Sequence, residues 1–182
     1  MSEQERSLHK PTDNLGARDR FQRGVACLWR QDRADNEEGM KLLRQAIALD
    51  TEFGRPHGYL AFGDCLLLFY ERADNRDEVL SRGIKAANRA LAIDRRDYFA
   101  YHAAGRLCTL SGNHRGAVRA LETCIDINPI FLPKVTLVWQ RLMSMAVIRN
   151  WRATIAIWPT GLARTIPWHK MRFTTRPPPI FA

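Results

Sequence analysis

YFAYHAAGRLCTLSGNHRGAVRALETCIDINPIF, residues 98–131, is the stretch that decides the fold. Its helix-like ending, TCIDIN at Asn128, has the same form as RALAID ending at Asp94 and QAIALD ending at Asp50. Similar endings at a spacing of roughly 20 to 50 residues indicate stacked helix pairs. No segment alternates as a strand would, so the sequence predicts an all-α fold.

Within this stretch, small residues stand where two antiparallel helices would touch: Gly105, Ala117 and Cys124. A larger side chain at such a contact would push the backbones apart. Gly112 fits the turn between the helices, and Pro129 follows the second one. The pattern resembles the tetratricopeptide repeat (TPR), a helix–turn–helix unit of about 34 residues. The alternative is an unrelated helical bundle, in which the repeated endings would be a coincidence.

Two degenerate copies precede this unit, with insertions between their helices. The predicted helices are 16–31, 35–49, 53–70, 75–93, 97–110 and 113–127, with Asp35 and Asn75 as expected N-caps paired with Glu38 and Glu78. The resemblance implies a right-handed TPR-type solenoid of three helix pairs, 15–51, 52–97 and 98–131, after a linker at 1–14. The expected repeat-packing residues are Gly24, Ala46, Ala61, Ala90, Gly105, Ala117, Cys124 and Pro129.

The composition changes near residue 130. All 19 acidic residues lie in 1–129, whereas the 53 residues that follow contain eight Lys or Arg, and the net charge of the chain is +9. Continuing the repeat register puts Trp139, Trp151 and Trp158 at positions that require small residues, so a fourth repeat is not expected. We therefore expect an irregular basic tail at 130–182.

Three interpretations of this tail stay open. Basic and aromatic residues together could contact anionic lipid or nucleic acid, although no such motif recurs. Residues 132–148 could instead form a terminal helix that covers the last repeat, since Val135, Val138, Leu142 and Met145 recur at helical spacing. Third, the tail could be translated out of frame, because an arbitrary frame of a GC-rich gene readily loses Asp and Glu.

The sequence offers no basis for catalysis, so a non-enzyme is expected. Phosphate-binding glycine loops and HExxH are absent, and the four cysteines and five histidines are scattered, so no cofactor or metal is expected. Cys108 and Cys124 fit buried repeat positions. The apolar run 135–148 is shorter than the roughly 20 residues that cross a bilayer. Unpaired cysteines and the lack of an apolar leader favour the cytoplasm.

In TPR arrays the first helix of each pair lines the concave face, and this implies a surface for an unidentified protein or peptide, with no small-molecule substrate. The candidate peptide-binding residues are Arg18, Phe21, Arg55, Phe62, Phe99, His102 and Arg106. Aromatic rings there would hold apolar side chains, and arginines would bind carboxylates. The alternative is that Phe21 and Phe62 belong to the core.

A narrower resemblance lies at residues 10–24, KPTDNLGARDRFQRG. This segment resembles the linker and first helix of the C-terminal TPR regions of bacterial class III adenylate/guanylate cyclases, and the match extends over about residues 10–129. Its matching residues are Pro11, Thr12, Asn14, Leu15, Ala17, Asp19, Arg23 and Gly24. Related segments also follow winged-helix regulators. The resemblance implies a detached regulatory region without a cyclase domain, or else an inactive remnant of a cyclase locus.

Overall fold

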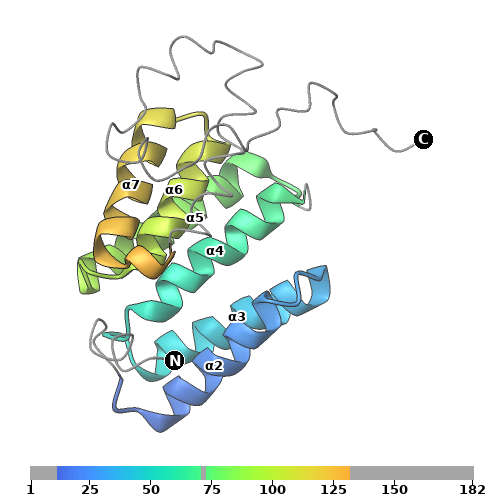
Figure 1. Cartoon of the computed structure of the whole chain (residues 1–182). Helices are drawn as coiled ribbons and strands as arrows, with labels where there is room; N and C mark the ends of the chain where they lie inside the picture. The colour runs from blue at the N-terminus through green and yellow to red at the C-terminus, as the bar shows by residue number, and fades with distance from the viewer. Residues whose placement is uncertain (1–11, 71–72, 132–182) are drawn as a thin grey trace. The chain divides into compact units, whose positions relative to one another are not determined.

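The computed structural model describes residues 12–70 and 73–131. These residues form six α-helices and no strand, so the predicted all-α class is confirmed for this part of the chain. The helices are α2 (Leu15–Leu28), α3 (Arg33–Leu49), α4 (Arg55–Phe69), α5 (Arg76–Ile93), α6 (Tyr98–Leu110) and α7 (His114–Ile127), followed by the 3₁₀ turn η1 (Pro129–Phe131) (Figure 1). The three interpretations of the tail concern 132–182, which lie outside the described residues.

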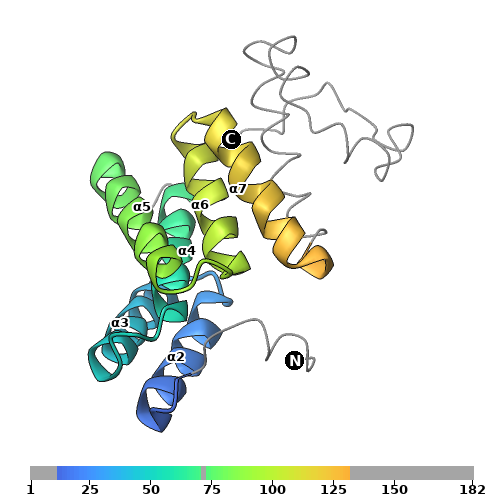
Figure 2. The ribbon, with the colours of Figure 1, turned by 90° about the vertical axis from the view of Figure 1, so that its left-hand side faces the viewer.

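Consecutive helices pack as pairs, which we call the first (α2–α3), middle (α4–α5) and third (α6–α7) pair (Figures 1 and 2). Helix α4 also packs on α3 and α6, and α5 packs on α6. Among the described helices, neither α2 nor α3 brings a Cα atom within 8 Å of α6 or α7. The middle pair therefore meets the first pair at one junction, the first junction, and the third pair at another, the second junction.

Side-chain caps explain where most of these helices begin, because the first backbone N–H groups of a helix need an acceptor outside it. Asn75 caps α5 as predicted, since its side chain accepts from the N–H of Glu78 at 3.3 Å. The predicted cap Asp35 is wrong. Asp32 caps α3 instead, and Asp35 lies in the first turn, where it binds Arg30 at 2.9 Å. The motif RADN therefore has two roles. At residues 33–36 it forms the first turn of α3, whereas at residues 72–75 its last residue, Asn75, is the N-cap of α5.

Small residues lie where the helices of a pair approach most closely. A Cβ atom added to Gly24 would lie 2.9 Å from the carbonyl oxygen of Gly39, and one added to Gly105 would lie 2.6 Å from Cγ of Leu121. Of the predicted packing residues, Pro129 is exposed and begins η1, and the others are buried: Gly24, Ala46, Ala61, Ala90, Gly105, Ala117 and Cys124.

Two glycines in the second helices of the first two pairs were not predicted as packing residues. Gly39 stands seven residues before Ala46, and Gly83 stands seven before Ala90, as Ala117 does before Cys124. Both glycines are buried, and a Cβ atom on Gly83 would lie 3.0 Å from Leu107. The seven-residue spacing from the alanine or cysteine of each repeated helix ending was the signal that could have identified them.

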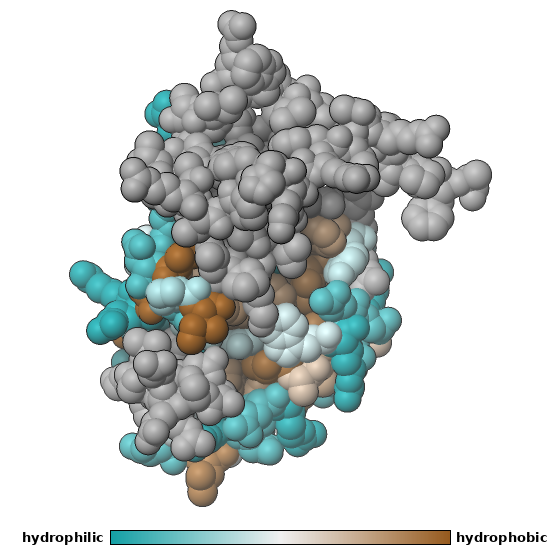
Figure 3. Space-filling view, in the orientation of Figure 1, coloured by the Kyte–Doolittle hydropathy of each residue, from teal (hydrophilic) through white to brown (hydrophobic). Residues whose placement is uncertain are grey.

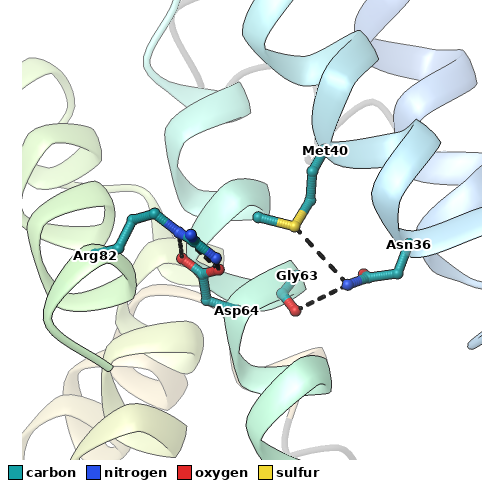
Figure 4. A network of polar contacts seen from close by, with 5 residues as sticks. All are labelled: Asn36, Met40, Gly63, Asp64 and Arg82. Carbon is teal, nitrogen blue, oxygen red and sulfur yellow. Dashed lines mark hydrogen bonds and ion pairs between the residues drawn. The ribbon is translucent and has the colours of Figure 1, made fainter. Parts of the chain in front are cut away.

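Polar contacts join α4 to the helix on either side (Figure 4). Toward α5, the carboxylate of Asp64, which is 1% exposed, accepts from Arg82 with a shortest distance of 2.6 Å. Toward α3, the buried side-chain amide of Asn36 donates to the carbonyl oxygen of Gly63 at 3.3 Å. Burial raises the pKa of Asp64 above its ordinary value, and the hydrogen bond from Arg82 opposes this shift.

Candidate interaction surface

Aromatic side chains from the first helix of every pair form one continuous cluster, which we call the aromatic row. Phe21 of α2 packs edge-on against Tyr59 of α4, with ring centroids 5.2 Å apart, and Tyr59 stacks on Phe99 of α6 at 4.0 Å. Phe62 contacts Phe99 at 5.4 Å, and Phe131 of η1 lies 6.1 Å from Phe99. The row therefore runs through α2, α4, α6 and η1.

The candidate peptide-binding residues divide into buried rings and more accessible arginines. Phe21, Phe62, Phe99 and His102 are all buried, with exposed fractions of 8% or less. Arg18 is exposed, while Arg55 and Arg106 are half-buried. The four rings thus also serve the core, as the alternative interpretation of Phe21 and Phe62 proposed, and the three arginines are the more accessible candidates.

The same arginine-on-ring arrangement occurs twice. The guanidinium carbon of Arg55 in α4 lies 5.4 Å from the ring centroid of Phe21 in α2. The guanidinium carbon of Arg106 in α6 lies 5.5 Å from the ring of Phe62 in α4 and 5.7 Å from that of Phe69. Such cation–π contacts fix a long side chain in place. Each guanidinium also faces a buried titratable group, since burial raises the pKa of Tyr59 and that of Cys65, and Arg55 and Arg106 respectively oppose these shifts.

The first helices of the pairs carry little acidic charge to oppose these arginines. Helix α6 has no Asp or Glu, α4 has only Asp64 and α2 has only Asp19. Asp64 is paired with Arg82, and Asp19 lies 3.6 Å from Arg23. Within the described residues, neither Arg55 nor Arg106 forms a salt bridge. The second helices carry the remaining acidic residues of the helices.

Several titratable groups are buried beside the row. Asp97 caps α6 by accepting from the N–H groups of Phe99 and Ala100, at 2.9 and 3.1 Å, and burial raises its pKa to about 6. Burial raises the pKa of Tyr59 to about 12 and that of the Cys65 thiol to about 12 as well. These groups are therefore held in their neutral forms more readily than in water, which suits an apolar interior.

Sequence reasoning missed part of the row. Phe53, Tyr59, Phe69 and Phe131 were not among the candidates, although Phe53 lies 5.1 Å from Phe21 and Phe131 lies 5.0 Å from His102. Helical periodicity was a usable signal for Tyr59, which stands three residues before Phe62. Figure 3 shows apolar surface lying between hydrophilic side chains on the face seen in Figure 1.

Residues 12–70 and 73–131 show no cluster of metal ligands, no paired cysteines and no membrane-spanning helix. No three His, Cys, Asp or Glu side chains of these ranges gather as a metal ion would require. The four cysteines are free thiols, with Cys65 and Cys124 buried. None of the helices described is long and apolar enough to cross a membrane.

No protein-family model matches the chain, and a search of curated proteins found no match.

Proposed function

We propose that this chain is a right-handed TPR-type solenoid that serves as a non-catalytic scaffold for protein–protein interaction in the cytoplasm. Support comes from three helix pairs that contact only their neighbours and from small residues at corresponding places in each pair. In such arrays the first helices line one face, which here carries the aromatic row. The single observation that carries the proposal is the repeated placement of an arginine over a ring of the preceding pair.

A binding function explains that repetition better than stability does. A cation–π pair contributes roughly 0.5–1 kcal/mol at an exposed site and about 2 kcal/mol when desolvated, so two of them add only a small part to a fold that already buries the rings. A fixed guanidinium group beside apolar surface is, by contrast, a common element of binding sites, where arginine and aromatic residues dominate the energy. We therefore assign the face formed by α2, α4 and α6, the A-helix face, to partner binding.

The experiment compares cross-linking from two sides of the molecule. A photo-cross-linking amino acid replaces exposed Arg18 on α2 or, as the control, exposed Lys85 on α5, in cells that express the full chain. We expect a specific adduct from position 18 that Arg106→Gln weakens, and none from position 85. Equal adducts from both positions, or an adduct that Arg106→Gln leaves unchanged, would contradict the assignment of this face.

We further propose that the chain corresponds to the TPR regulatory region of a cyclase-type or regulator protein. The resemblance of residues 10–24 supports this proposal. In the structure, two residues of this segment join the ends of the first pair: Thr12 donates to the carboxylate of Asp50, and Asn14 donates to the carbonyl oxygen of Leu49 at 3.0 Å. Sequencing the neighbouring DNA tests the idea. An upstream catalytic reading frame is expected, and its absence would remove this proposal without affecting the scaffold.

A further inference from the structure

We propose that residues 132–148 form a helix that docks on the third pair, where α7 lacks a neighbour that the other second helices have. Helix α3 contacts α4 of the next pair, and α5 contacts α6 of the next pair. Among the described elements, α7 contacts only α6 and η1. The third pair therefore ends in a side of α7 that a further helix can cover, and this inference is independent of partner binding at the A-helix face.

Each of the first two pairs forms a polar contact with the next first helix. In the first pair, the side-chain amide of Asn36 donates to the carbonyl oxygen of Gly63 in α4 at 3.3 Å. In the middle pair, the guanidinium of Arg76 donates to the carbonyl oxygen of Leu110 in α6 at 2.9 Å. A side chain near the start of each second helix thus binds the backbone of the helix that follows.

His114 holds the position in α7 that Asn36 holds in α3. It stands ten residues before Cys124, as Asn36 stands ten before Ala46. Its Nδ1 is buried and has no hydrogen-bond partner within the residues that the structure describes. A buried polar atom without a partner is costly, so such atoms usually have one. The backbone of a docked helix would supply it, as Gly63 does for Asn36.

The chain leaves the third pair as it leaves the other two. After each second helix, one N–H group donates to the carbonyl oxygen three residues before it: Phe53 to Asp50 at 3.3 Å, Asp97 to Asp94 at 3.2 Å and Phe131 to Asn128 at 3.0 Å. The first two of these turns lead directly into α4 and α6. Residue 132 therefore follows the third turn at the point where a docking helix would begin.

The sequence of 132–148 suits a single docking helix. Pro133 is tolerated at a helix start, as Pro56 is in the first turn of α4. Helical spacing would place apolar residues on one side and polar residues on the other: Val135, Val138, Leu142 and Met145 against Thr136, Gln140 and Ser144. Trp139 would conflict with a second helix of its own pair, but a terminal helix has no such partner.

The occupant is this chain rather than another molecule. Because 132–148 follow Phe131 directly, their docking is intramolecular, and a segment on a short linker reaches an effective concentration in the millimolar range. A second copy or a partner would have to offset the loss of its own translational and rotational freedom. Docking also removes the apolar side of the segment from water.

Hydrogen exchange of the full chain tests the proposal. Leu142→Asp places a charge on the apolar side of the proposed helix, and Ser144→Asp, the matched control, places the same charge on its polar side. We expect Leu142→Asp to speed amide exchange in α7 roughly tenfold and Ser144→Asp to change it less than about twofold, because the docked helix protects α7. Unchanged exchange in α2 and α3 checks that the rest of the fold is retained.

A second pair of variants tests the polar contact. His114→Asn supplies an amide like that of Asn36 and should retain slow exchange in α7, whereas His114→Ala should speed it severalfold. Equal exchange in α7 within either matched pair of variants would overturn the proposal. A dimer in light scattering, with exchange in α7 that slows as protein concentration rises, would overturn it too, because a second copy would then be the occupant.

Discussion

Helix α4 meets the pair before it and the pair after it in different ways. At the first junction, aromatic rings meet edge-on or tilted: Phe21 packs edge-on against Phe53 and Tyr59, and Trp29 lies 5.4 Å from Phe62. At the second junction, Tyr59 stacks on Phe99 at 4.0 Å, and a Cβ atom on Gly58 would lie 3.4 Å from Cα of Ala100. One flank of α4 therefore packs through crossed rings, and the other packs through a stacked pair of rings beside a glycine.

Loss of a ring should lower the free energy of unfolding more at the second junction than at the first, and this is the largest effect that we expect. Phe99→Ala should lower the free energy of unfolding by about 4 kcal/mol, because Phe99 is 2% exposed and contacts rings of both α4 and η1. Phe21→Ala should cost less, about 2–3 kcal/mol, because Phe21 is less completely buried, at 8% exposed. Urea denaturation followed by circular dichroism measures both.

Hydrogen exchange separates the two variants further. Phe21→Ala should raise amide exchange mainly in α2 and α3, because those helices contact no other pair than the middle one. Phe99→Ala should raise exchange mainly in α6 and α7, and in α4, whose rings Phe99 contacts. A uniform increase for Phe21→Ala would show that the three pairs open together.

The second largest effect is a pH dependence located at the second junction. Asp97 has a pKa of about 6 in the folded protein against an ordinary value of 3.8, so the folded state binds more protons than the unfolded state between these values. Its contribution is therefore fully present at low pH and is lost as pH rises from about 4 to about 6, by about 3 kcal/mol. Asp97→Asn should keep the cap but gain that amount relative to the natural chain over this range.

Asp32→Asn is the matched control, because it removes the same charge from a helix cap that is exposed and belongs to the first pair. Over the same pH range, Asp97→Asn should separate from the natural chain by more than Asp32→Asn does. Unfolding midpoints in urea at several pH values provide the comparison. Parallel curves for Asp97→Asn and the natural chain would disprove the assignment of this pH dependence to Asp97.

A smaller effect distinguishes the two polar contacts of α4 in Figure 4. Arg82→Ala leaves the buried carboxylate of Asp64 unpaired, which should cost about 2 kcal/mol at neutral pH once the partial exposure of Arg82 is allowed for. The cost should shrink at acid pH. Without Arg82 the pKa of Asp64 is higher still, so its carboxylate is protonated at a higher pH and the unpaired buried charge disappears. Asn36→Ala removes a neutral hydrogen bond and should cost about 1 kcal/mol at any pH.

The smallest effects should come from alanine at the two glycines of α4. Alanine favours a helix over glycine by about 1 kcal/mol, which offsets mild crowding. In Gly63→Ala the new Cβ atom would lie 2.9 Å from Cγ of Met40, whose flexible side chain can move. In Gly58→Ala it would lie 3.3 Å from the Asp97 carboxylate. Both variants should stay within about 1 kcal/mol of the natural chain in urea denaturation, and a loss above 2 kcal/mol would show that the junction concerned cannot widen.

The sequence predicted the helices well and their contacts less well. Six helices lie within a few residues of the predicted ranges, because periodicity and the repeated endings are local signals. The cap at Asp32 was missed because Asp32 and Asp35 both suit an N-terminus, and only the turn before α3 decides between them. In that turn Gln31 adopts a φ of 59°, where the third pair has Gly112 at 79°.

The candidate surface depends on contacts between helices, and these contacts could not be predicted from the sequence. Arg106 was predicted to face a partner, but its place over Phe62 and Phe69 depends on how closely α6 packs on α4. The burial of Phe99 likewise follows from Tyr59 stacking on it. Both are set by the junctions, whose geometry comes from the volumes of residues far apart in the chain.

Tyr59 belongs to both junctions, since Phe21 and Phe99 each contact its ring. Burial raises the pKa of its phenol to about 12, so the hydroxyl stays protonated in mildly alkaline buffer while the helices remain packed. In an alkaline titration, the ultraviolet absorbance of the Tyr59 phenolate should therefore appear at a higher pH than that of solvent-exposed tyrosines. Subtracting the alkaline titration curve of Tyr59→Phe from that of the natural chain would isolate the absorbance of the Tyr59 phenolate. Its appearance would report the opening of either junction.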